Sequence, residues 1–253
     1  MTAVLTDEAR ILVSGIGKSF VLHHTHTLKD RVVRALKRNA GASSSDFTAL
    51  EDVSFEVADG EAVALLGLNG SGKSTLLKLI SGVMRPDEGG VLVRGKIAGL
   101  IEVGAGFHPD LTGRENVYLN GAILGMTEKE IDERFEMIVA FSEIEEFIDT
   151  EVKFYSSGMF LRLAFAVAVH TDPDVFLVDE ILAVGDEPFQ KKCLARIREL
   201  KAAGKALVIV SHDLDMIEKL CDRAILLQGG HVIFDGPTRR AVATLRGENQ
   251  GEL

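Results

Sequence analysis

Short apolar runs alternate with longer segments of helical periodicity along most of the chain. Apolar or alternating runs predict strands at residues 10–13, 50–57, 61–66, 91–93, 175–178 and 206–210, and a hairpin at 223–235. Helical spacing of apolar positions predicts helices at residues 76–80, 115–124, 128–141, 158–169 and 188–203. Buried strands that alternate with helices are typical of an α/β domain with a mainly parallel sheet. Residues from about 102 to 170 are helical in pattern and predict an insertion within that domain.

A glycine-rich segment, the phosphate loop, connects the strand at 61–66 to the helix that follows. Its glycines let the backbone curl so that successive N–H groups point at a phosphate, and the helix beginning near Lys73 adds its positive end. Lys73 would reach the β- and γ-phosphates, and the Ser74 hydroxyl would ligate Mg²⁺. A glycine turn with a surface lysine is the simpler alternative, but the strand before it and the helix after it favour a nucleotide-phosphate site. The candidate phosphate-binding residues are Gly67, Leu68, Asn69, Gly70, Ser71, Gly72, Lys73, Ser74 and Thr75.

Two further apolar strands end in residues that suit phosphate chemistry. Asp179 and Glu180 directly follow the strand at 175–178, and ligands bind at this carboxyl edge in parallel sheets. Asp179 could hold Mg²⁺ through its water shell, and Glu180 could orient or deprotonate an attacking water. His212 follows the strand at 206–210. A lone histidine at a strand end is more often structural, but the shared sheet edge favours a contact with the γ-phosphate.

Composition and charge narrow the class of protein. The chain has 253 residues, 46% of them hydrophobic, and its longest purely aliphatic or aromatic run, 163–169, is far too short to span a membrane. Charged residues within the first twelve positions argue against a secretory signal. Cys193 and Cys221 provide neither a disulfide framework nor a metal-binding spacing, which favours buried or incidental thiols in a reducing cytoplasm. A net charge of −10 argues against nucleic-acid binding over the whole surface.

A basic insertion, at about residues 21–46, contrasts with this acidic balance. Its apolar residues between positions 32 and 36 fall on one side of a possible helix, surrounded by basic residues. Such a cationic amphipathic segment suits an anionic membrane surface, and a solvated helix is an equally good interpretation. The basic residues are Lys29, Arg31, Arg34, Lys37 and Arg38.

These motifs, in this order, make the chain similar to the nucleotide-binding subunit of ATP-binding-cassette (ABC) transporters over about residues 11–236. The phosphate loop matches the family's Walker A loop, residues 175–179 its Walker B strand, and His212 its switch histidine. Residues 155–159, Tyr-Ser-Ser-Gly-Met, stand where the family has its signature, and residues 183–186 where it has its D-loop. The resemblance implies an α/β P-loop NTPase fold: a parallel-sheet core with an antiparallel β subdomain and a helical signature subdomain. ATP and Mg²⁺ are the implied cofactors.

The resemblance also implies roles for residues outside the phosphate loop. Ser156, Ser157 and Gly158 would form a second anion site that caps the γ-phosphate held by the opposite subunit, with Asp186 in the D-loop. One chain supplies one loop and one signature, so a head-to-tail homodimer would enclose two ATP molecules. Phe20 is the candidate for stacking on adenine. Glu102 occupies, within a residue or so, the place of the family's glutamine that ligates Mg²⁺.

Residues 104–121, the altered signature and the basic insertion look like the exporters of lipid-linked polysaccharides such as O-antigen, teichoic acid and galactan. This resemblance implies integral-membrane permease partners, a lipid-linked polysaccharide substrate and a peripheral location on the cytoplasmic face of the cell membrane. We expect residues 1–236 to form the ATPase domain and 237–253 a short tail without a carbohydrate-binding domain. The alternative is a soluble ABC ATPase, for example of iron–sulfur cluster assembly, which would not predict the insertion or the 104–121 segment. The signature and His212 argue against a small-molecule P-loop kinase.

Overall fold

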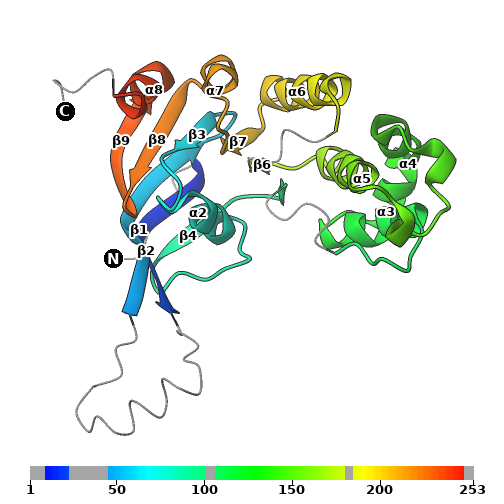
Figure 1. Ribbon diagram of the computed structural model, residues 1–253, viewed down its shortest axis with the longest axis horizontal. Helices are drawn as coiled ribbons and strands as arrows, with labels where there is room; N and C mark the ends of the chain where they lie inside the picture. The colour runs from blue at the N-terminus through cyan, green and yellow to red at the C-terminus, as the bar shows by residue number, and fades with distance from the viewer. Residues whose placement is uncertain (1–8, 23–44, 101–105, 180–184, 248–253) are drawn as a thin grey trace, which may run out of the picture.

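The computed structural model describes residues 9–22, 45–100, 106–179 and 185–247. Its strands form one sheet of three strands and one of six. Figure 1 shows the smaller sheet on the opposite side of the molecule from helices α3 (Gly113–Ile123) and α4 (Glu128–Ser142). Within the described part of the chain, no helix combines the length and the apolar character needed to cross a bilayer.

The smaller sheet is antiparallel and has the order β2-β1-β4. It is formed by β1 (Ala9–Leu22), β2 (Ser45–Ala58) and β4 (Glu88–Val93). β1 continues well beyond the predicted end at Val13, because the Ser14-Gly15 pair is a bulge in the ladder and not a turn. Leu22 pairs with Ser45, so the ends of the predicted insertion belong to this long hairpin, and residues 23–44 lie outside the described residues.

The larger sheet has the order β5-β6-β7-β3-β8-β9, and only its last pair is antiparallel. Its central strands carry uninterrupted apolar sequences and are buried on both faces, as helices covering a parallel sheet require. Adjacent β6, β7 and β3 are the strands that precede Asp179, His212 and the phosphate loop, so the three predicted motifs meet at one edge. The strands are β3 (Ala62–Leu66), β5 (Ile97–Gly99), β6 (Val175–Val178), β7 (Ala206–Ile209), β8 (Arg223–Gln228) and β9 (His231–Pro237).

The predicted helices are present, with ends that move by at most three residues, and the structure adds four short ones. Side-chain caps explain several starting points: Thr112 and Thr127 form capping boxes before α3 and α4, and Asp186 and Asp213 cap the helices that begin at Glu187 and Leu214. The remaining helices are α2 (Lys73–Ile80), η1 (Glu145–Phe147), η2 (Val152–Phe154), α5 (Ser157–Val169), α6 (Glu187–Ala202), α7 (Leu214–Leu220) and α8 (Thr238–Leu245).

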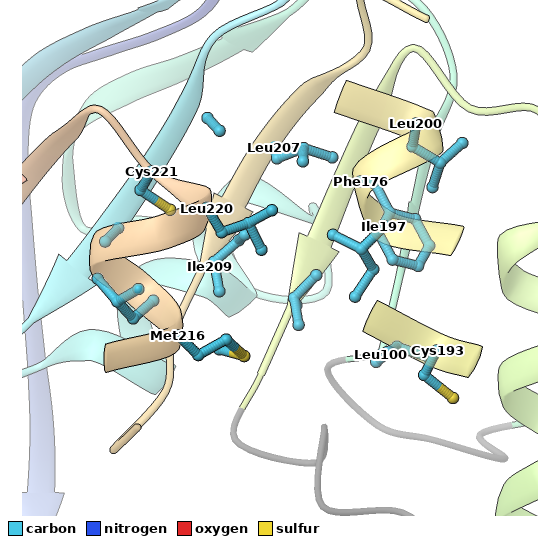
Figure 2. Packing of buried hydrophobic residues seen from close by; sticks show 14 of the residues in the cluster. Leu100, Phe176, Cys193, Ile197, Leu200, Leu207, Ile209, Met216, Leu220 and Cys221 are labelled. Carbon is cyan, nitrogen blue, oxygen red and sulfur yellow. The ribbon is translucent and has the colours of Figure 1, made fainter. Parts of the chain in front are cut away.

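Three buried clusters stabilise these layers. One lies on the side of the larger sheet that α6 and α7 cover, where Phe176 faces Ile197 and Leu200 (Figure 2). A second fills the space between the two sheets and α2, and a third joins α3, α4 and α5 in the helical part. Cys193 and Cys221 are both buried, and burial raises the pKa of each thiol to about 12, so these thiols stay protonated.

Candidate nucleotide site

The phosphate loop begins where the buried strand β3 ends and passes directly into α2. Gly72 is the N-cap of α2, with φ of 107°, a conformation that disfavours residues with a side chain. A Cβ there would also lie 2.7 Å from the Ala49 carbonyl oxygen, so β2 packs directly against the loop. The unpaired N–H groups of the first turn of α2 therefore point out of a tightly curled backbone, as an anion site requires.

Lys73 is the charged group of this loop. Its side chain is drawn inward, so that the residue is only 7% exposed. Nζ donates hydrogen bonds to the carbonyl oxygens of Gly67 at 2.8 Å and Leu68 at 3.2 Å. A phosphate oxygen entering the loop would offer this ammonium a charged acceptor, and charge-assisted hydrogen bonds are stronger than those to neutral carbonyls.

Two cavities border the phosphate loop. The first has a volume of about 520 Å³ and brings His212 and Ser211, at the end of β7, to the same space as Gly67, Asn69 and Lys73. The second, of about 390 Å³, is lined by β2 and the loop, and contains Gly70, Gly72, Ser74 and Thr75 together with Phe47. The exposed Ser74 hydroxyl is thus available at the start of α2.

Asp179 lies at the same sheet edge. Val178 of β6 pairs with Ile209 of β7, which in turn pairs with Ala64 of β3. The half-buried Asp179 therefore follows β6, two strands away from β3, at nearly the level where the phosphate loop begins. Glu180 and Glu102 lie outside the described residues, so their roles remain predictions.

The predicted signature residues are at the start of α5. Ser156 is the N-cap, and its Oγ accepts a hydrogen bond from the Met159 N–H at 3.2 Å. Ser157 and Gly158 follow as the first residues of the helix, whose backbone N–H groups have no partner within the helix. A cavity of about 320 Å³ is lined by Ser156, Gly158 and Asp186. The structure thus joins the signature to the D-loop aspartate.

A second link between these motifs was not predicted from the sequence. Arg162, on α5, donates from Nη2 to Asp186 Oδ1 at 2.7 Å and from Nη1 to Glu143 Oε2 at 2.9 Å. Its guanidinium also lies over the Phe189 ring, with Cζ 4.7 Å from the ring centroid. Only an arginine offers a planar fork that reaches two carboxylates and a ring at once, but the sequence alone does not reveal the partners.

The signature cavity and the two phosphate-loop cavities share no lining residue among those the structure describes. A family model described as "ABC transporter" matches residues 50–183, which include the phosphate loop, the signature and the Walker B strand. The chain belongs to the ABC transporter family. It is an ATPase of that family.

Named proteins resemble this ABC ATPase over nearly its whole length. It is 43% identical to an "O-antigen export system ATP-binding protein RfbB" of Klebsiella pneumoniae, over 93% of this chain and 96% of that protein. It is 40% identical to a "Teichoic acids export ATP-binding protein TagH" of Listeria innocua, over 88% of this chain and 65% of that protein. A solved structure, "Structure of ATP binding subunit of ABC transporter", superposes with a TM-score of 0.74 and 25% identity, covering 96% of this chain and 95% of that one.

The aromatic residue beside the nucleotide site of this ABC ATPase was not predicted from its sequence. Phe47 is 47% exposed and lines the cavity that also contains Ser74. Phe20, the predicted adenine-stacking residue, lies directly opposite Phe47 in the β1–β2 register and is half-buried beneath the Lys18 ammonium, 5.7 Å from its ring centroid. Residues opposite each other in an antiparallel pair share a face of the sheet, so both rings lie on the loop-facing side.

Proposed function

We propose that this ABC ATPase drives export of a lipid-linked polysaccharide across the cytoplasmic membrane. The observation that carries the proposal is the 43% identity to an O-antigen export ATP-binding protein, with 96% of that protein covered. Identity to a teichoic acid export ATP-binding protein supports the same class of substrate. The relatives do not favour a soluble ABC ATPase of iron–sulfur cluster assembly.

Hydrolysis would use groups at the carboxyl edge of the larger sheet. A hydroxyl from Ser74 and a carboxylate from Asp179 are oxygen donors of the kind Mg²⁺ prefers, and Glu102 is a further candidate. Mg²⁺ bound there would neutralise charge on the β- and γ-phosphates. Lys73 would bind the same phosphates, Glu180 would orient or deprotonate the attacking water, and His212 would contact the γ-phosphate.

The proposed assembly is a head-to-tail homodimer attached to permease subunits. The signature cavity of one chain is separate from its own phosphate-loop cavities, so each ATP needs the signature of a second chain to be enclosed. We expect this homodimer to lie on the cytoplasmic face of the membrane, where integral-membrane partners provide the path for the polysaccharide.

The basic insertion is proposed to dock at an anionic membrane surface beside the permease. The insertion separates β1 from β2, which pair with each other as far as Leu22 and Ser45, and a fold of this kind does not need it for stability. Each Lys or Arg near such a surface would contribute about 1 kcal/mol, weakened by salt. Charge reversal at Arg31, Arg34, Lys37 and Arg38 should spare ATP hydrolysis by the isolated subunit but reduce export. Unchanged export would leave the insertion a solvated segment.

Co-purification tests the proposed function. A tagged copy of the chain is isolated from detergent-solubilised membranes and its partners are identified. Integral-membrane subunits in fixed ratio to the chain, with ATP hydrolysis stimulated by lipid-linked polysaccharide, are the expected result. Recovery with soluble partners alone, such as iron–sulfur scaffold proteins, would contradict the proposal.

A further inference from the structure

The turn between β8 and β9 lies directly behind the phosphate loop. Gly230 in this turn donates its backbone N–H to the carbonyl oxygen of Ser71 at 3.3 Å, while its own carbonyl oxygen accepts from the Glu51 N–H at 3.0 Å. One glycine therefore connects the middle of the phosphate loop to β2. In Figure 1 the β8–β9 hairpin, in orange, runs beside β3, the strand that leads into the loop.

The packing around Gly230 leaves no room for a side chain. A Cβ on Gly230 would lie 2.9 Å from the Ala49 carbonyl oxygen, against which Gly72 of the phosphate loop also packs. At the other end of the loop, a Cβ on Gly67 would lie 2.3 Å from the Leu227 carbonyl oxygen in β8. The β8–β9 hairpin therefore packs against one end of the phosphate loop, at Gly67, and β2 packs against the other end, at Gly72. Because these contacts are close, a shift of the turn would also move the loop.

Backbone contacts, and not the side chain of Ser71, hold the middle of the loop. Ser71 is only 4% exposed, and its Oγ has no hydrogen-bond partner in the structure. A buried hydroxyl without a partner contributes no stabilisation and costs desolvation. The Ser71 carbonyl, in contrast, is bonded to Gly230.

We propose that Gly230 is a positioning residue for phosphate binding. The hydrogen bond from the Gly230 N–H keeps the Ser71 carbonyl directed toward the β8–β9 turn. The N–H groups of the loop therefore already face the phosphate position before ATP binds. Such preorganisation increases the affinity for ATP, because the loop loses less conformational entropy when ATP binds. The inference rests on the proposed use of this loop for ATP, and it extends that use to a hairpin more than 150 residues further along the chain.

The chain provides a matched control in the adjacent residue. Gly229 also has a positive φ, +55°, but a Cβ added there would meet no atom within 4 Å, whereas Gly230 has φ +87° and the contact with Ala49. Gly229→Ala and Gly230→Ala therefore make the same chemical change in the same turn, and only the second places a Cβ against β2, on which the phosphate loop packs.

The test compares ATP affinity, steady-state hydrolysis and melting temperature of these two variants with the wild type. Strain of roughly 1–3 kcal/mol at Gly230 predicts a Kd and KM for ATP raised roughly 5- to 150-fold in Gly230→Ala, with kcat at saturating ATP close to that of Gly229→Ala. Equal ATP affinity in the two variants would overturn the inference. Failure of the wild type to bind ATP would instead overturn the use of this loop for ATP.

Amide hydrogen exchange on the wild type gives a second test that does not depend on a variant folding. Binding of ADP should slow exchange of the Gly230 and Glu51 amides, because tightening the loop tightens both bonds to the turn. The amides of Ala224 and Gly236, paired at the other end of the same hairpin, are the internal control. Identical exchange of Gly230 and Glu51 with and without ADP would contradict the proposal.

Discussion

At the scale of single residues, the nucleotide site depends on one buried ammonium and a curled backbone. Lys73 is held by two loop carbonyls, which keep its charge at the centre of the loop. The three phosphate-loop glycines allow the curl, and the N–H groups of α2 complete the anion site. Each of these features follows from residue type and spacing.

Phe47 is the residue whose role is most readily tested. If its ring stacks on adenine, Phe47→Ala should raise the Kd for ATP roughly 5- to 150-fold, since stacking on a base is worth about 1–3 kcal/mol. Affinity for inorganic triphosphate should not change, because that ligand has no base. Phe20→Ala is the matched control. A loss confined to Phe20→Ala would instead assign stacking to the residue predicted from the sequence.

This pair of phenylalanines illustrates what a single sequence reveals of the site and what it leaves out. Glycine and lysine spacing defined the phosphate loop, and apolar strands defined the positions of Asp179 and His212. Phe47 could not be found in this way, because its place depends on the register of two strands separated by the insertion. Arg162 and Gly230 depend likewise on long-range contacts.

At the scale of elements, segments with a strong apolar pattern were predicted well, and several segments without one were not. β3, β6 and β7 are buried on both faces, so their apolar runs are unmistakable. β5 has three residues, and α7 and α8 have seven and eight, too few for a periodic pattern. α8 lies in the predicted tail and packs on β8 and β9, so Thr238–Leu245 is part of the folded domain.

The capping box of α4 makes the helical part sensitive to acid. Hydrogen bonds from the Thr127 N–H and hydroxyl to the Glu130 carboxylate lower the pKa of Glu130 to about 2. Because the folded-state pKa is depressed, the stabilisation is complete above the ordinary pKa, near 4.5, and is lost as the pH falls toward 2.

Glu130→Gln should remove this dependence, since an amide does not titrate. Melting temperatures measured from pH 6 to pH 2.5 should therefore fall less steeply in the variant than in the wild type. Glu133→Gln, one turn further along α4, is the control. Parallel curves for wild type and Glu130→Gln would contradict the assignment of the acid sensitivity to this capping box.

At the scale of the whole molecule, the phosphate loop and the predicted signature residues of one chain line separate cavities. A head-to-tail homodimer would bring each phosphate loop to the partner's signature. The Arg162–Asp186 pair would then connect the signature helix to the segment that follows Glu180. ATP would act as the contact between chains, and its hydrolysis would release them.

Mixed dimers test this composite arrangement. Lys73→Ala chains mixed with Ser156→Arg chains form dimers with one intact site and one doubly damaged site. Random mixing should recover about a quarter of wild-type hydrolysis, since half of the dimers are mixed and each retains one of two sites. Mixtures no more active than the separate variants mean that both sites are needed or that sites are not composite. Light scattering in the presence of ATP distinguishes these two explanations, because composite sites require that dimers form when ATP is bound.

Export in cells tests most directly whether ATP hydrolysis by this chain moves a lipid-linked polysaccharide. The native copy is replaced by Glu180→Gln, which should retain ATP binding while hydrolysis falls at least about 10²-fold. Polysaccharide is then measured at the cell surface and on the lipid carrier inside the cell. We expect surface polysaccharide to disappear and the lipid-linked form to accumulate, with both restored by the wild-type chain. Unchanged surface polysaccharide, without accumulation inside, would contradict the account.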